Sequence, residues 1–226
     1  MATPLTTVEA RTTLRGGIVV LQEAFGVTDH IVDVCNRFAE AGWTAVAPHL
    51  FHRQGDPVLA YDDLEHALPL AHGLDGTQMD EDVDAAIASL QAAGIEAQTI
   101  AVVGYCMGGS VAFHTAARRR LCAAVTYYGG GLTKGRFGYP AAVDEAALLQ
   151  TPWLGHFGDK DGSIPVDDVE ALRTAITAAP VEAELHRYAD AQHGFNCNDR
   201  PAVFDAAASA QAWTRTFDFL DRHRPR

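Results

Sequence analysis

The sequence predicts an α/β protein with a mostly parallel central sheet and helices on both faces. Short apolar runs, each of a length suited to a buried strand, alternate with longer segments in which apolar residues recur at helical spacing. Strand and helix patterns that alternate in this way are typical of parallel sheets, because a helix returns the chain to the next strand. At 226 residues, with no repeat, linker or low-complexity segment, the chain is expected to form a single domain over residues 1–226.

The apolar runs are expected to be buried strands. Gly17 to Leu21 is apolar throughout, which suits a strand covered on both faces. A later run ends at Pro48, which cannot donate to a strand ladder. The last run alternates between polar and apolar residues, as a less buried strand does. The expected strands are 17–21, 43–48, 99–105, 122–128, 152–157 and 182–188.

The periodic segments are expected to be helices. Gly42 stops the first of them. Thr77 is the expected N-cap of the third, with acidic residues in the first turns that follow. The C-terminal segment is amphipathic, and Phe204, Trp213 and Leu220 are among its core candidates. The expected helices are 29–41, 62–74 (a weaker pattern), 77–93, 107–118, 166–178 and 202–222.

Composition narrows the class of function. The net charge of -12 argues against nucleic acid as a partner, because phosphate binding needs clustered basic residues. The compact basic run Arg118 to Arg120 ends a predicted helix, where it complements the helix dipole. Residues 1–15 are polar and lack the apolar core of a signal peptide, and no stretch is long enough to span a bilayer. We expect a cytoplasmic protein, a monomer or small homo-oligomer, with no membrane partner.

The cysteines favour one reactive thiol over a disulfide framework. Cys35, Cys106, Cys122 and Cys197 show no C-x-x-C spacing. Cys35 falls on a helical pattern and Cys122 at a strand start, so both are expected to be inert core residues.

Cys106 lies in the pattern G-x-C-x-G, between a predicted buried strand and a predicted helix. This is the nucleophile elbow G-x-S-x-G with sulfur in place of oxygen. Gly104 and Gly108 leave room for the strand and helix to cross, and the helix N-terminus favours a thiolate. A buried structural cysteine in a glycine-flanked turn fits the short motif equally well.

Reactive side chains follow other predicted strands too. Glu23, Asp161 and His193 each lie in a loop after a strand, and ligands bind at the carboxyl ends of strands in open α/β sheets. The order nucleophile, acid, histidine is that of the α/β-hydrolase triad. Taken singly, each residue has an ordinary explanation. Glu23 could be a loop carboxylate, Asp161 (like Asp159) a turn or N-cap residue, and His193 a solvated histidine. Their joint placement favours catalysis.

At these residues the chain resembles the dienelactone hydrolase family, which comprises carboxymethylenebutenolidase-like α/β hydrolases with a cysteine nucleophile. The resemblance runs over nearly the whole length. The motifs that carry it are Val20 to Gly26, Gly104 to Gly109, Tyr127 to Gly129, His156 to Gly158 with Asp161 and Pro165, and His193 to Phe195.

The resemblance implies the α/β-hydrolase fold and a role for each residue. Cys106 would be the nucleophile, His193 the base and Asp161 the carboxylate. Asp161 is preferred to Asp159 because the family pattern H-x-G-x-x-D-x-x-x-P counts from His156 to Pro165.

Two further groups gain a role from the same match. Glu23 would lie near the thiol and help to generate the thiolate when substrate binds. A carboxylate beside a thiol also keeps the sulfur protonated and protected from oxidation at rest. The backbone N–H groups of Met107 and Ala24 would form the oxyanion hole.

The chain departs from the family at the substrate-binding positions. Dienelactone-cleaving members hold the substrate carboxylate with two arginines. One position, four residues after His193, is Cys197 here, and the region 62–66 offers no arginine for the other. Arg53 and Arg200 are the candidates to replace them, and Tyr128 and Phe195 are further candidate substrate contacts. Cys197 is either a bystander or a second reactive thiol.

These observations predict a cysteine hydrolase of a small ester or lactone that needs no cofactor. Acyl transfer or thioester cleavage on the same triad is one alternative, and a non-catalytic small-molecule-binding homologue is another. His49 and His52 have H-x-x-H spacing but no clustered further ligands, so we expect no metal site.

Overall fold

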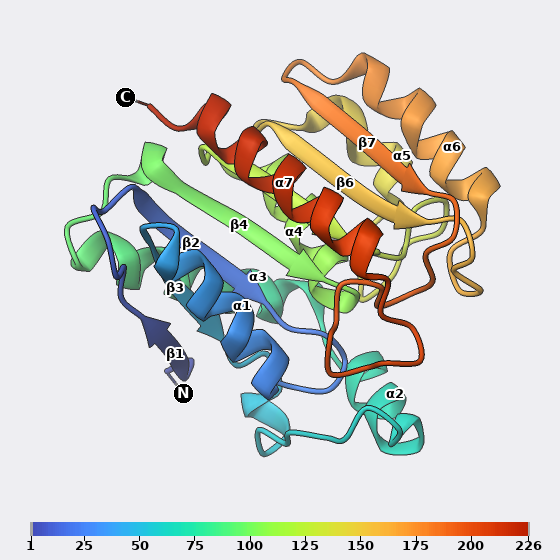
Figure 1. The fold of residues 1–226 in the computed structure, drawn as a ribbon, viewed down its shortest axis with the longest axis horizontal. Coiled ribbons are helices and arrows are strands. Elements are labelled where there is room, and N and C mark those ends of the chain that lie inside the picture. Colours follow the sequence, from blue (N-terminus) through green and yellow to red (C-terminus); the bar gives the residue numbers. More distant parts are fainter. Residues whose placement is uncertain (1, 226) are drawn as a thin grey trace.

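The computed structural model describes residues 2–225 and contains a seven-stranded sheet in the order β1-β3-β2-β4-β5-β6-β7 (Figure 1). Strands β2 to β7 pair in parallel, and only β1 runs antiparallel, against β3. The predicted mostly parallel sheet is confirmed. The strands are β1 Leu5–Val8, β2 Gly16–Leu21, β3 Trp43–Pro48, β4 Ile100–Tyr105, β5 Ala123–Tyr127, β6 Trp153–Gly158 and β7 Ala183–Tyr188.

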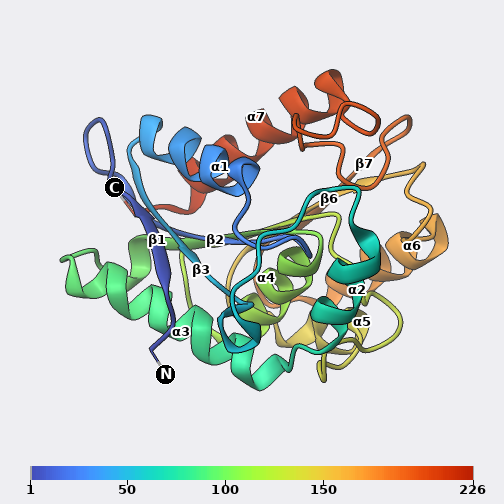
Figure 2. The same cartoon turned by 90° about the horizontal axis from the view of Figure 1, so that it is seen from below.

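Helices cover both faces of the sheet. Helices α1 and α7 lie on one face, and α3, α4 and α5 lie on the other (Figure 2). One continuous apolar core runs through both layers. The helices are α1 Asp29–Glu40, α2 Leu64–His72, α3 Gly76–Ala92, α4 Met107–Arg118, α5 Ala142–Glu145, α6 Val166–Ala175 and α7 Ala206–His223. Short 3₁₀ turns cover 52–54, 97–99, 146–148 and 176–178.

The N-terminal strand β1 was not predicted. Its residues, Leu5 to Val8, pair with Pro48 to Ala45 at the edge of the sheet. An edge strand does not need an apolar run, because only one of its sides is covered. The threonine-rich segment therefore carried no strand pattern.

Two helix starts differ from expectation. The N-cap of α3 is Asp75, whose carboxylate accepts hydrogen bonds from the N–H groups of Thr77 and Gln78, so the prediction of Thr77 was wrong. Helix α7 begins only after its N-cap, Asp205. Phe204 precedes that cap and is 36% exposed, so it is not part of the core.

The basic run at the end of α4 makes ion pairs with other helices. Arg118 Nη2 lies 2.7 Å from Glu145 of α5, and Arg119 Nε lies 2.5 Å from Asp84 of α3. These contacts tie α4 to its neighbours, so the run does more than complement the helix dipole.

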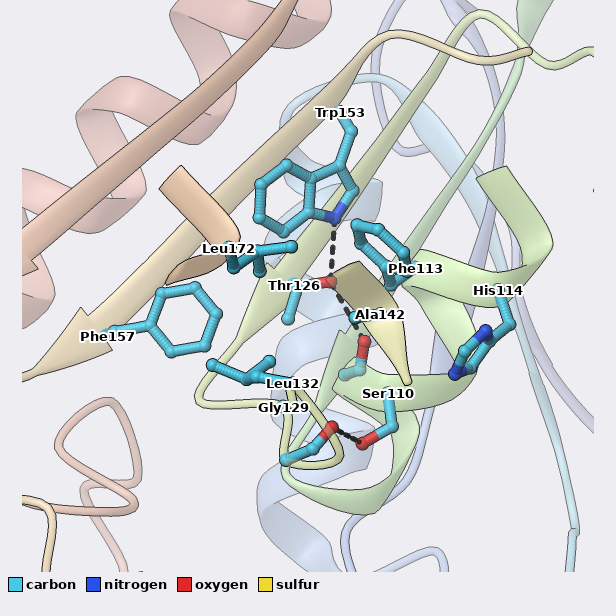
Figure 3. Close-up of a pocket in the computed structure, with 12 residues that line it drawn as sticks. Ser110, Phe113, His114, Thr126, Gly129, Leu132, Ala142, Trp153, Phe157 and Leu172 are labelled. Carbon is cyan, nitrogen blue, oxygen red and sulfur yellow. Dashed lines mark hydrogen bonds between the residues drawn. The ribbon is translucent and has the colours of Figure 1, made fainter. Parts of the chain in front are cut away.

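Hydrogen bonds to the first turns of α4 fix that helix against the sheet (Figure 3). Thr126 Oγ1 of β5 donates to Gly109 O (2.9 Å) and accepts from Trp153 Nε1 (3.0 Å). Ser110 Oγ donates to Gly130 O at 2.8 Å. The pocket drawn there is largely apolar and lies behind α4, and Cys106 does not line it. The residues that line this pocket hold α4, and with it the turn at Cys106, against the sheet.

Among residues 2–225, no helix has the length and apolar character that crossing a membrane requires.

Candidate active site

Cys106 occupies a strained turn between β4 and α4. Its φ of 53° and ψ of -113° lie where residues other than glycine are rare. Its N–H donates to Tyr127 O at 3.0 Å, which holds the turn on the neighbouring strand. A Cβ on Gly104 would lie 1.9 Å from Gly108 O, and one on Gly108 would lie 2.4 Å from Leu21 O. Both glycines of the motif are therefore needed for the crossing.

The side chain of Cys106 is partly exposed, whereas Cys35, Cys122 and Cys197 are buried. A purely structural cysteine does not need a strained turn or access to solvent. The local geometry therefore favours the nucleophile-elbow interpretation of the motif.

Asp161 and His193 meet at the same edge of the sheet. His193 Nδ1 lies 2.6 Å from Asp161 Oδ2. The other oxygen of Asp161 accepts from the Ser163 N–H (2.8 Å) and hydroxyl (2.7 Å) and from the Ile164 N–H (3.2 Å). Burial on its own raises the pKa of Asp161, but the bonds from His193 and Ser163 outweigh burial and hold that pKa below its usual range. Asp161 is therefore a fixed anion beside the imidazole.

The alternative acid, Asp159, faces elsewhere. Its carboxylate forms a two-pronged ion pair with Arg187, at 2.6 and 2.8 Å. The two carboxylates, which are only two residues apart in the sequence, therefore have different partners in the structure.

The imidazole of His193 also contacts Cys106. Burial of His193 lowers its pKa, but the charge interaction with Cys106 and the hydrogen bonds with Asp161 and Cys106 outweigh burial and raise the pKa to about 10. His193 is therefore placed to exchange a proton with Cys106, as the base beside a nucleophilic cysteine must be.

Replacing Asp161 with asparagine should shift the pH dependence of activity. The imidazolium is present below its pKa and is lost as pH rises through about 10. Without the Asp161 anion that pKa falls, so the alkaline limb of kcat/KM should move to lower pH and the rate should drop at least about tenfold. A pH–rate profile with an ester substrate measures both. Asp159→Asn is the control and should leave the limb in place.

Glu23 lies in the loop after β2, and its carboxylate is 1% exposed. The Gly108 N–H donates to Gln22 O at 3.1 Å, so this loop lies directly against the first turn of α4. Neither carboxylate oxygen of Glu23 has a hydrogen-bond partner among the described residues. Within residues 2–225, neither the Met107 N–H nor the Ala24 N–H donates a loop or turn hydrogen bond to the backbone.

Aromatic rings form one wall of the site. Tyr128 has a φ of 40°, and its ring lies 5.0 Å from the ring of His193. Phe195 is fully buried and packs on Tyr128 (5.5 Å) and Tyr188 (5.0 Å). Phe195 therefore packs behind Tyr128 and supports its ring.

The two candidate arginines lie in different places. Arg53 pairs with Asp82 (2.6 Å) and Glu81 (3.2 Å) of α3, so its guanidinium already has two carboxylate partners. Arg200 lies over the rings of Phe25 (5.7 Å) and Tyr61 (5.3 Å).

Arg200 also lies beside the histidine loop, because a Cβ on Gly194 would be 2.5 Å from Arg200 Nη1. Among residues 2–225 it forms no ion pair with a carboxylate. Of the two arginines, only Arg200 has a charge placed to meet a ligand at this edge of the sheet.

The remaining candidates for a metal site or a second reactive thiol are His49, His52 and Cys197. His49 Nδ1 bonds Asp56 (2.7 Å), whereas His52 Nε2 bonds Asp82 (3.0 Å), so the two histidines do not share a site. Burial and the nearby Glu23 carboxylate raise the pKa of Cys197 to about 12, so its thiol stays protonated near neutral pH.

Sequence reasoning missed Tyr61 and His30. Tyr61 packs edge-on against Phe25 at 4.8 Å and so lies close to the Glu23 loop. His30 is buried beside the same loop, with an exposure of 1%. Nothing in the local pattern marks either residue, because each reaches the site only through the path of the folded chain.

The sheet order, the elbow after β4, and the acid and histidine after β6 and β7 are the arrangement of an α/β hydrolase. Within that class, the model of the dienelactone hydrolase family matches residues 5–224. The chain belongs to the dienelactone hydrolase family.

Individual relatives agree with this assignment. The chain is 37% identical over 210 residues to a Yersinia pestis protein named "Putative carboxymethylenebutenolidase", covering 91% of this chain and 78% of that one. It is 31% identical over 211 residues to the carboxymethylenebutenolidase of Rhodococcus opacus, covering 91% and 81%. The crystal structure of "Putative Dienelactone Hydrolase" from Klebsiella pneumoniae is similar with a TM-score of 0.87 and 33% identity, over 97% of this chain and 92% of that one.

Proposed function

We propose that the protein is a cysteine hydrolase that cleaves a small ester or lactone through Cys106, His193 and Asp161. The observation that carries the proposal is the continuous chain of contacts from Asp161 through His193 to a cysteine held on a strained elbow. A thiolate, an imidazole and a carboxylate in this order are the groups that acyl transfer needs.

The geometry supports a two-stage reaction. The Cys106 thiolate attacks the carbonyl carbon, and the N–H groups of Met107 and Ala24 stabilise the oxyanion. The His193 imidazolium gives its proton to the leaving alkoxide, which leaves an acyl-cysteine. His193 then removes a proton from water, the resulting hydroxide attacks the thioester, and the acid departs as the thiolate re-forms.

Glu23 would act at the start of this cycle. Its carboxylate is buried near the elbow and lacks a hydrogen-bond partner, so it is poised to accept a proton when substrate rearranges the site. The thiol of Cys106 is the proton donor in this step. We therefore retain Glu23 as the residue that helps to generate the thiolate.

Mass spectrometry of the protein incubated with an ester and lactone panel tests the proposal. A substrate should add its acyl mass to the peptide that contains Cys106, and the adduct should decay as the free acid appears. Lasting absence of an adduct together with tight ligand binding would favour the non-catalytic alternative. Esters or thioesters formed from added alcohols or thiols would favour acyl transfer.

We expect Arg200 to select substrates that carry a carboxylate. Its guanidinium lies near the triad without an ion-pair partner, and a charge-assisted contact contributes more binding energy than a neutral one. Arg200→Ala should lower kcat/KM about tenfold or more for a carboxylate-bearing lactone. The same substitution should change kcat/KM for the matching neutral ester much less. Arg53→Ala is the control. Equal effects of Arg200→Ala on both substrates would contradict this role.

A further inference from the structure

Glu23, His30 and Cys197 form a buried cluster beside the proposed active site. They come from three elements: the loop after β2, the first turn of α1 and the loop after β7. One donor atom from each side chain, a carboxylate oxygen, an imidazole nitrogen and the Cys197 sulfur, lies within 4.8 Å of the other two. The exposures are 1%, 1% and 0%. In the part of the chain that the structure describes, this is the one such group of metal-ligating side chains.

Two members of the cluster lack partners. Both carboxylate oxygens of Glu23 and both ring nitrogens of His30 are buried without a hydrogen bond within residues 2–225. Leaving such groups unpaired in a protein interior costs free energy, and a buried carboxylate costs the most. Glu23 and His30 do not pair with one another either. A partner that satisfies both Glu23 and His30 must therefore be a cation that accepts an electron pair from each of them.

A divalent transition metal ion has those properties. A thiolate, an imidazole and a carboxylate together suit Zn²⁺ and its neighbours, whereas Ca²⁺ and Mg²⁺ prefer oxygen ligands alone. Tetrahedral zinc with bonds of about 2.0–2.3 Å places its ligand atoms roughly 3.5 Å apart. Small side-chain rotations would bring donor atoms that lie within 4.8 Å of one another to the tetrahedral spacing. Three protein ligands leave the fourth position of the tetrahedron for water.

Neighbouring residues pack against two of the three side chains. The ring of His30 meets Tyr105 edge-on at 5.9 Å. The Tyr61 hydroxyl lies beside the Cys197 thiol and 2.9 Å from Thr28 Oγ1, the N-cap of α1. Groups that hold metal ligands in place from behind contribute to affinity in this way.

We propose that Glu23, His30 and Cys197 bind one Zn²⁺-class ion. Cys197 loses its thiol proton to solvent as the sulfur coordinates the ion. A consequence, which rests on the proposed function, is reversible inhibition: the ion holds the Glu23 carboxylate and so withdraws it from Cys106. The binding itself does not depend on hydrolase activity.

Titration of Zn²⁺ into the Cys106→Ala variant tests the binding without the nucleophile. We expect one ion per chain by equilibrium dialysis. Adding Cys197→Ala should weaken binding at least about tenfold. Cys122→Ala in the same background is the matched control, since this buried thiol lies outside the cluster, and it should leave affinity unchanged. Equal affinity with and without Cys197, or no stoichiometric binding, would overturn the proposal.

Co²⁺ gives a second readout that does not rely on affinity. Cobalt bound to a thiolate shows an intense sulfur-to-metal charge-transfer band. The band should appear in Cys106→Ala and be absent from Cys106→Ala with Cys197→Ala, and His30→Asn should weaken or shift it. A band that survives Cys197→Ala would place the ion elsewhere and refute the site, whether or not the wild-type protein hydrolyses esters.

Discussion

Replacement of Cys106 with alanine is expected to reduce kcat for ester hydrolysis at least about 10⁴-fold, because the proposed acyl intermediate forms on the Cys106 sulfur. The fold should survive. Alanine and cysteine share the same Cβ, so the strained turn at φ 53° treats them alike, and the side chain is only partly buried. Steady-state kinetics and thermal unfolding, measured on the same preparation, check both parts.

Two variants sharpen this test. Cys106→Ser should retain little activity, since a hydroxyl needs a stronger base than a thiol. Cys122→Ala removes a buried thiol away from the triad and should leave kcat nearly unchanged. Wild-type turnover by the Cys106→Ala variant would rule out Cys106 as the nucleophile.

Substitution of Gly104 with alanine is expected to cost about 3 kcal/mol or more of the free energy of unfolding. The new Cβ would lie 1.9 Å from Gly108 O and 2.3 Å from Gly108 C, which are backbone atoms that cannot rotate away. Helix α4 would have to move off β4, and the elbow would move with it. Urea denaturation measures the loss, and residual folded protein should be inactive.

Gly162→Ala is the control for this substitution. Nothing lies within 4 Å of a Cβ at Gly162, and its backbone needs no positive φ. Its free energy of unfolding should change by no more than about 0.5 kcal/mol. Similar stability losses at the two glycines would show that close approach at the elbow is not what Gly104 provides.

The strands and the elbow could be predicted because their signals are local. The strand Trp43–Pro48 and the helix Met107–Arg118 begin and end where the apolar run and the glycine-flanked turn place them. The edge strand β1 could not, since its polar residues pair with β3 through backbone groups that every sequence possesses.

Side-chain partners were harder to predict than elements. The choice of Asp161 over Asp159 depended on a family spacing, and the structure pairs Asp161 with His193. The ion pair of Arg53 could not be predicted either, because its partner, Asp82, lies on a helix 29 positions away. The Glu23–His30–Cys197 cluster joins three distant segments and leaves no spacing signal at all.

The two helices that share one face of the sheet, α1 and α7, are the first and last long helices of the chain (Figure 2). Phe38 of α1 packs at 5.2 Å against Trp213 and at 5.6 Å against Phe217 of α7. During synthesis, the apolar side of α1 is therefore made long before its cover, and it stays uncovered until the C-terminal segment has left the ribosome. A chain stalled or cut before Trp213 would display that surface, which makes such fragments natural targets for chaperones and quality-control proteases.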